Sequence, residues 1–111
     1  MADMSQSERD ELDFGIVEVD ERGIIRSYNR YESELAGVAP EAAMGRNFFT
    51  QVAPCTNNRL FYGRFKRGLA DGQLDAQIPY TFTYKMRPTN VVVRMYLDTQ
   101  HATTFVFVKR R

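Results

Sequence analysis

A stretch of strict alternation is the feature that most constrains how this chain of 111 residues can fold. From residue 77 to residue 86, large apolar or aromatic side chains take every second position. They are Ile78, Tyr80, Phe82, Tyr84 and Met86, separated by Gln77, Pro79, Thr81, Thr83 and Lys85. Alternate side chains of a β-strand point to opposite faces, so this segment predicts a strand with one aromatic face. Such a face has to be covered, which requires a sheet and a second layer.

Four further segments are rich in β-forming residues. Residues 14–19 and 24–27 flank the turn sequence DERG at 20–23, which predicts a hairpin. After a turn at 87–90, β-forming residues continue over 91–97 and again over 103–108, separated by a polar loop. The chain therefore begins and ends in strands.

The middle of the chain carries helical patterns. Asn29 predicts the cap of a short helix that runs to Ala36, and a second short piece is expected over residues 41–44. A longer helix is expected to begin in the run of capping residues at 56–58. Its apolar side repeats every four residues, at Phe61, Phe65 and Leu69. The basic side chains elsewhere on this helix predict a solvated face.

Strands at both ends with helices between them predict an α+β fold. We expect a central antiparallel sheet with short helices and one longer helix on one side, an order that resembles PAS domains. The length suits one domain with one core. Residues 1–13 are polar and acidic and predict a short leader or cap, followed by a domain over residues 14–111.

Composition excludes several classes of partner and site. Lys and Arg number 15 against 14 Asp and Glu, so no overall field attracts nucleic acid or an anionic membrane. No apolar run is long enough to cross a bilayer. One cysteine and one histidine cannot by themselves supply a disulfide or a structural zinc site. We expect a cytoplasmic, metal-free monomer.

Cys55 is the residue whose chemistry needs explaining, although a lone cysteine is often an inert buried side chain. It precedes the capping run, so it is expected at a helix N-terminus, where amide groups and the helix dipole stabilise a thiolate. A cysteine hydrolase or acyl transferase also needs a base, and the only histidine, His101, lies in a predicted loop. A reactive Cys55 is therefore better explained as an attachment point than as a catalyst, and the chain is not expected to be an enzyme.

Tyr28 and Glu32 form a second candidate pair. They are four residues apart, so they share a face if this segment is helical. A phenol and a protonated carboxyl can each donate a hydrogen bond to a buried anion, and burial raises the pKa of a carboxyl. The aromatic face of the 78–86 strand could wall a flat ligand or be ordinary core packing.

Four segments together resemble the photoactive yellow protein family of blue-light receptors. They are GRNFFTQVAPCT at 45–56, FYGRFK at 61–66, YTFTYKMRPT at 80–89 and VFVKR at 106–110. The resemblance implies p-coumaric acid held as a thioester on Cys55, with its phenolate hydrogen-bonded by Tyr28 and protonated Glu32. It also implies that blue light isomerises the chromophore from trans to cis, that Glu32 passes on its proton, and that the domain partly opens towards an unidentified signalling partner.

The same resemblance assigns pocket residues and exposes departures from the family pattern. The pocket would be lined by Val17, Val52, Ala53, Thr56, Phe82 and Met86, with Met86 assisting thermal re-isomerisation. Ala36 stands where the pattern has a threonine supporting the tyrosine, and Val38 stands where it has an arginine shielding the pocket. The alternative hypothesis is a PAS-type ligand- or partner-binding signalling module without a covalent chromophore.

Overall fold

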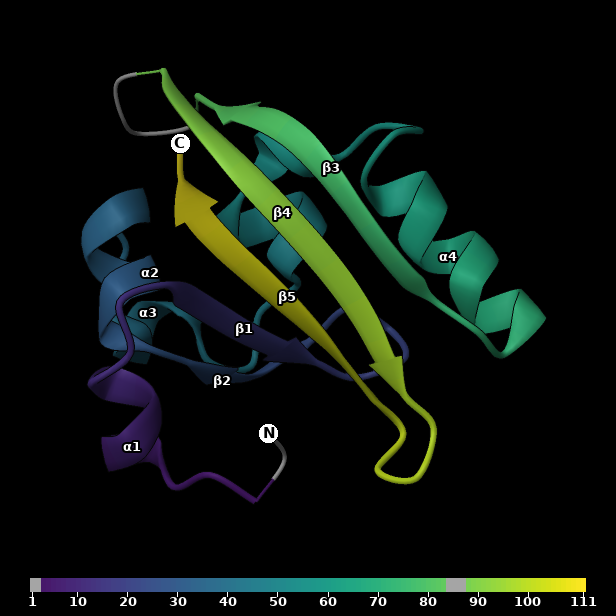
Figure 1. The fold of residues 1–111 in the computed structure, drawn as a ribbon, viewed down its shortest axis with the longest axis horizontal. Helices are drawn as coiled ribbons and strands as arrows, with labels where there is room; N and C mark the ends of the chain where they lie inside the picture. The colour runs from purple at the N-terminus through teal and green to yellow at the C-terminus, as the bar shows by residue number, and fades with distance from the viewer. Residues whose placement is uncertain (1–2, 84–87) are drawn as a thin grey trace.

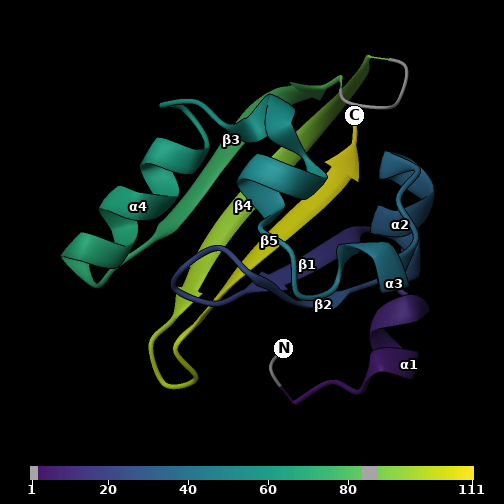
Figure 2. The same cartoon turned by 180° about the vertical axis from the view of Figure 1, so that it is seen from behind.

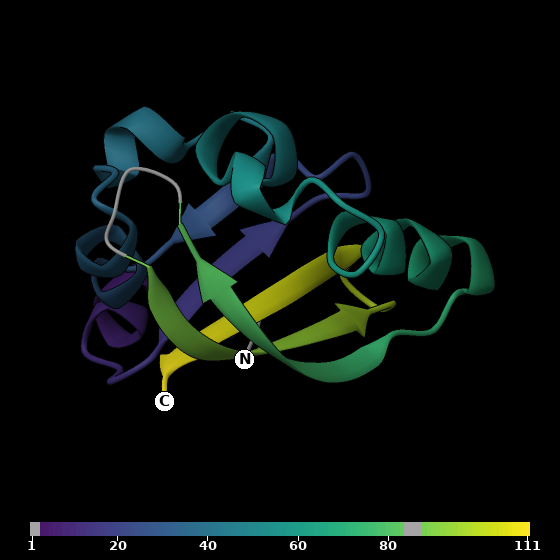
Figure 3. The same cartoon turned by 90° about the horizontal axis from the view of Figure 1, so that it is seen from above.

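A computed structural model describes residues 3–83 and 88–111 of the protein. Five antiparallel strands form one sheet in the order β2-β1-β5-β4-β3, and helices α2, α3 and α4 lie on the same face of it (Figures 1 and 2). Seen from above, the molecule has two layers, the curved sheet and the helices over it (Figure 3). This confirms the predicted α+β, PAS-like architecture.

The elements follow one another as the sequence pattern suggested, with short helical turns in the middle. In chain order they are α1 (Gln6–Asp10), β1 (Gly15–Val19), β2 (Ile25–Tyr28), α2 (Arg30–Ala36), α3 (Pro40–Ala43), the π-helical turn η1 (Phe48–Val52), the 3₁₀ turn η2 (Pro54–Thr56), α4 (Tyr62–Asp71), β3 (Asp75–Phe82), β4 (Thr89–Asp98) and β5 (Thr103–Arg110). Within the described residues, no helix is long and apolar enough to span a membrane.

The β1–β2 hairpin closes through the predicted turn. The Asp20 carboxylate accepts hydrogen bonds from the backbone N–H groups of Arg22 at 2.8 Å and Ile24 at 2.9 Å. Gly23 then takes a left-handed backbone angle, φ +84°, which costs glycine little. The turn directs β2 back along β1 and delivers Tyr28 to the start of α2.

Strand β3 shows the predicted alternation. Ala76, Ile78 and Phe82 are buried, whereas their neighbours in sequence are exposed or half-buried. Pro79 has no backbone N–H, and it is tolerated because β3 is an edge strand, which within the described part of the chain pairs only with β4. The continuation of the alternation through Tyr84 and Met86 lies outside the described residues.

The longer helix begins later than expected. The capping run at 56–58 predicted its start, but α4 begins at Tyr62. The side-chain oxygen of Asn58 accepts from the Phe61 N–H at 3.0 Å, and the hydroxyl and N–H of Thr56 both donate to the Ala53 carbonyl. Cys55 therefore lies in a 3₁₀ turn and not at the N-terminus of a long helix, so the expected dipole effect of that helix on the thiol was wrong.

Candidate functional site

A small cavity lies between the sheet and the helical layer. It is lined by Tyr28, Glu32, Ala36, Phe48, Val52, Ala53, Cys55 and Phe82. Its volume is about 10 Å³, close to the room that one water molecule needs. A ring-sized group can occupy this site only if some lining side chains move. The cavity nevertheless brings together the thiol and the tyrosine–glutamate pair, which lie far apart in the sequence.

Two side chains donate hydrogen bonds to the backbone carbonyl of the half-buried Cys55. The Tyr80 hydroxyl donates to the Cys55 carbonyl oxygen at 2.6 Å, and the Asn58 side-chain amide donates to the same oxygen at 3.2 Å. That amide also lies 2.5 Å from the Tyr80 oxygen, so the three groups form a closed set. The roles of Tyr80 and Asn58 were not predicted, because Asn58 was interpreted only as a capping residue and Tyr80 only as part of an aromatic face.

Tyr28 and Glu32, which also line the cavity, each have a buried polar atom that lacks a hydrogen-bond partner among the described residues. Both residues are 1% exposed, and among the described residues neither Tyr28 Oη nor Glu32 Oε2 has a hydrogen-bond partner. Burial raises the pKa of Glu32 to about 8. Burial, and then the charge of Glu32, raise the pKa of Tyr28. At neutral pH the two side chains are therefore a carboxylic acid and a phenol, each with a proton to donate.

The spacing of Tyr28 and Glu32 predicts that they share a face of a helix if their segment is helical, but the structure places them in different elements. Tyr28 ends strand β2, and Glu32 lies in the first turn of α2. The chain bends between them at Asn29, whose side-chain oxygen accepts from the N–H groups of Ile16 at 3.0 Å and Glu32 at 3.2 Å. This bend aims both side chains into one cavity.

Asn29 also ties the site to the leader. Its side-chain amide donates to the carbonyl oxygens of Arg9 at 2.8 Å and Phe14 at 3.0 Å. The fully buried Asn29 side chain thus accepts two hydrogen bonds and donates two. Sequence reasoning identified Asn29 as a helix cap but missed these long-range contacts, because local spacing carries no signal for them.

Glycine at position 15 makes room for the Glu32 carboxyl. A Cβ placed there would overlap Glu32 Oε2 and lie 3.2 Å from Glu32 Cβ. We therefore expect Gly15→Ala to displace the carboxyl and to lower the free energy of unfolding by about 1–3 kcal/mol, measured by chemical denaturation. In the control Gly63→Ala, the nearest atom to the new Cβ is 3.6 Å away, so stability should hold or rise slightly. Unchanged stability of Gly15→Ala would contradict this packing.

Glu32 should also make stability depend on pH. Burial raises its folded-state pKa to about 8, whereas an unfolded glutamate titrates near ~4.3. Between these two pH values, the folded chain therefore holds one proton more than the unfolded chain. The stabilisation that this proton gives is fully present below the unfolded pKa and is lost as the pH rises through the folded pKa. We expect the free energy of unfolding to fall by about 1.4 kcal/mol for each pH unit within this window. Glu32→Gln should flatten this slope, and identical profiles for the two proteins would contradict the assignment.

Of the other predicted site residues, Val17, Val38 and Thr56 are described by the structure but do not line the cavity. Val17 is fully buried in β1, Val38 packs partly buried against the core after α2, and Thr56 is buried with its hydroxyl bonded to Ala53. Met86 lies outside the described residues. Phe48 lines the cavity although the sequence reasoning did not assign it.

The only histidine lies outside the cavity. His101 is exposed in the loop between β4 and β5, with Nδ1 2.8 Å from Asp98 Oδ2. In Figure 1, this loop lies at one end of the sheet, and the last residues of β3 and the first residues of β4 lie at the other end. The described residues contain no group of three or more side chains suited to holding a metal ion. The cavity thus brings a thiol together with two buried proton donors, Tyr28 and Glu32.

Comparison with known proteins identifies the family to which this chain belongs. The model of the PAS fold matches residues 4–108. The photoactive yellow protein of Rhodothalassium salexigens is 44% identical over 110 residues, covering 99% of this chain and 88% of that protein. The Halochromatium salexigens protein of the same name is 40% identical over 110 residues, with the same coverage. Among solved structures, the photoactive yellow protein domain of the sensor histidine kinase Ppr from Rhodospirillum centenum has a TM-score of 0.92 and 44% identity, covering 96% of this chain and 94% of that domain.

Proposed function

The chain belongs to the photoactive yellow protein family, within the PAS fold, and we propose that it senses blue light through p-coumaric acid (4-hydroxycinnamic acid) bound as a thioester to Cys55. One observation carries the proposal. The cavity next to Cys55 is lined by two buried proton donors, Tyr28 and Glu32, and neither Tyr28 Oη nor Glu32 Oε2 has a partner among the described residues. Unsatisfied buried polar groups cost free energy, so a bound anion that accepts from both would stabilise the site.

The chemistry of the chromophore and that of the protein are separable. When bound, the chromophore supplies the absorption of blue light and a double bond that isomerises from trans to cis. Tyr28 and Glu32 orient the anionic end by donating hydrogen bonds to it, and Cys55 fixes the other end covalently. The burial of Glu32 keeps a proton at this carboxyl in the dark.

Loss of the proton from Glu32 would convert light absorption into a change of shape. A carboxylate in this buried position has no partner among the described residues, and an uncompensated buried charge costs several kcal/mol. Opening of the site towards water relieves that cost. Because Asn29 accepts from the N–H of Glu32 and donates to the Arg9 carbonyl, displacement of Glu32 would disturb the attachment of the leader.

Ala36 offers a test of how Tyr28 is supported. This residue is buried at the end of α2 and lines the cavity. We expect Ala36→Thr to shift the visible band to the blue, because a hydroxyl that supports Tyr28 concentrates negative charge on the phenolate in the ground state. The control Ala36→Val adds the same volume without a hydroxyl and should leave the band nearer its original position. Equal shifts in both variants would assign the effect to packing.

Absorbance spectroscopy tests the proposed function. The folded protein should acquire a visible band when activated p-coumarate is supplied, and blue light should bleach that band reversibly. A folded protein without a band would instead favour a PAS-type module that binds a ligand or a partner non-covalently. The related solved domain belongs to a sensor histidine kinase. We accordingly propose that the output of this chain is received by a signalling protein.

A further inference from the structure

The outer face of the sheet, opposite the helices, is covered at one end by the leader. Arg9 in α1 forms an ion pair with Glu18 of β1 at 2.7 Å, and its guanidinium lies 5.6 Å from the ring centre of Phe105. Phe105 is buried as a result, whereas Phe107, two residues further along β5, is only half-buried. The leader therefore leaves the Phe107 end of this face open.

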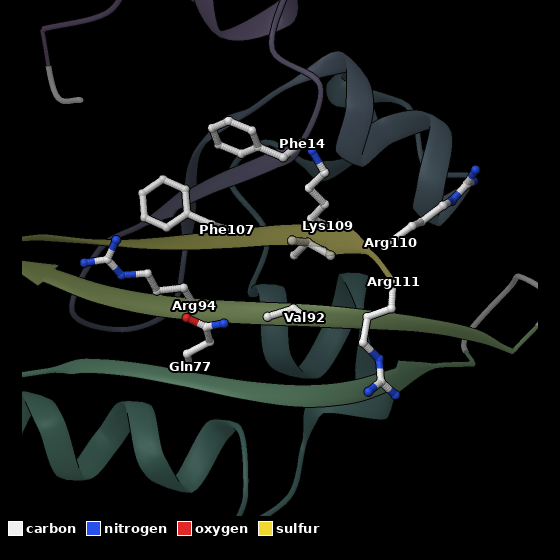
Figure 4. Close-up of a pocket in the computed structure, with 9 residues that line it drawn as sticks. Phe14, Gln77, Val92, Arg94, Phe107, Lys109, Arg110 and Arg111 are labelled. Atoms are coloured by element: carbon white, nitrogen blue, oxygen red, sulfur yellow. The ribbon is translucent and has the colours of Figure 1, made fainter.

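A shallow groove of about 400 Å³ occupies the open end. Half-buried Phe14, Val92 and Phe107 supply its apolar surface, and the rings of Phe14 and Phe107 pack edge to face at 6.1 Å. Figure 4 shows Val92 on β4 between Arg94 on one side and Arg111 on the other, with the Phe107 ring on the Arg94 side and the Phe14 ring beyond β5. Apolar surface of this kind within reach of water is typical of a binding site.

The rim of the groove is basic. Arg94 pairs with Asp75 through two contacts of 3.0 Å, and Lys109 pairs with Asp13 at 3.2 Å. Arg110 and Arg111 are exposed and form no ion pair with the described residues. The Asp13–Lys109 pair is itself exposed on both sides, so it is weak and a second carboxylate can replace Asp13 there.

We propose that this groove docks an acidic segment of a partner protein, with the apolar side chains of that segment on Phe14, Val92 and Phe107 and its carboxylates on Lys109 and Arg111. The exposed cations Lys109 and Arg111 match a segment that carries several negative charges, whereas a fatty acid carries a single charge. A second copy of this chain fits less well, because a two-fold interface would set the same basic rim against itself. The proposal goes beyond light sensing and does not depend on a chromophore.

The test is a titration of the whole isotope-labelled chain, in the dark and without chromophore, with the acetylated peptide Glu-Glu-Leu-Phe-Glu-Asp. Saturable NMR shifts should map to the amides of Val92 and of residues 107–111. The double variant Lys109→Glu, Arg111→Glu should weaken binding about tenfold or more, because two attractive charges become repulsive. The matched control Arg64→Glu, Arg67→Glu changes the net charge equally on α4, where neither arginine has an ion pair with the described residues, and should keep most of the affinity.

A peptide with serine in place of leucine and phenylalanine separates the apolar contribution from general charge attraction. It should bind at least about tenfold more weakly than the original. Equal weakening by the two double variants, or shifts that map to α4, would overturn the proposal. So would displacement of the peptide by laurate with higher affinity, which would assign the groove to a lipid, or loss of peptide binding through self-association, which would assign it to a second copy.

Discussion

Cys55→Ala should fold normally and acquire no covalent visible band when activated p-coumarate is supplied. Cys55 is the only cysteine of the chain, so no second thiol can take its place. The side chain is half-buried in the 3₁₀ turn η2, and the structural hydrogen bonds of this residue are made by its backbone carbonyl, which the substitution retains. We therefore expect complete loss of pigment with a change in unfolding free energy of only about 1 kcal/mol.

The loss of pigment has to be separated from loss of folding. Circular dichroism and chemical denaturation of the variant establish whether the α+β domain is intact. Cys55→Ser serves as a second control, because it keeps a polar atom of similar size while replacing the thiol by a weaker nucleophile. A normal covalent band in Cys55→Ala would show that attachment occurs elsewhere.

Glu32→Gln should shift the dark visible band to the red. The amide donates a weaker hydrogen bond than a carboxylic acid and has no proton to transfer. Excitation moves electron density away from the phenolate oxygen, so a hydrogen bond to this oxygen stabilises the ground state more than the excited state. Weakening the donor therefore raises the ground state more than the excited state, and the energy gap between them narrows. The infrared loss of a buried carboxylic C=O, expected when the original protein is illuminated, should disappear. The blue-shifted state should still form, with a stronger dependence on pH because its proton then comes from solvent.

Glu34→Gln is the matched control. Glu34 lies in the same helix as Glu32 but is exposed, so its replacement should leave both the dark band and the infrared change in place. Persistence of the C=O loss in Glu32→Gln, with an unmoved dark band, would assign Glu32 to an ordinary structural role. The same outcome in both variants would point to another buried acid.

Much of the fold could be predicted because its signals are periodic. The alternation from Gln77 onward predicts which side of β3 is buried, and the turn at residues 20–23 predicts the first hairpin. Asn29 and Gly37 mark the start and end of α2, where a side-chain cap and a left-handed angle of φ +71° are found. These features depend on neighbours in the sequence, so local rules describe them well.

The start of α4 could not be predicted from the same local rules. Thr56, Asn57 and Asn58 are all residues that can cap a helix, and the choice among them depends on tertiary contacts. Asn58 is held by Tyr80, a residue of β3, while Thr56 is tied back to Ala53. The turn around Cys55 is therefore shaped by a strand more than twenty residues later in the chain.

Sequence reasoning selects members of the candidate site but not their geometry. Cys55, Tyr28 and Glu32 were selected for their chemistry and by family resemblance, and the structure places all three around one cavity. The helical spacing offered for Tyr28 and Glu32 did not apply, because one belongs to a strand and the other to a helix. The contribution of Gly15 was not foreseen, since a missing side chain has a role only once its neighbour is known.

Mass spectrometry of the reconstituted protein tests most directly whether this chain carries a chromophore on Cys55. The unloaded chain is incubated with activated p-coumarate, measured intact and after proteolysis, and then treated with hydroxylamine, which cleaves thioesters. We predict the addition of one hydroxycinnamoyl group per chain, located on the peptide that contains Cys55 and removed by hydroxylamine. An unmodified mass in a folded protein, or a group on another residue that survives hydroxylamine, would contradict the proposed photoreceptor chemistry.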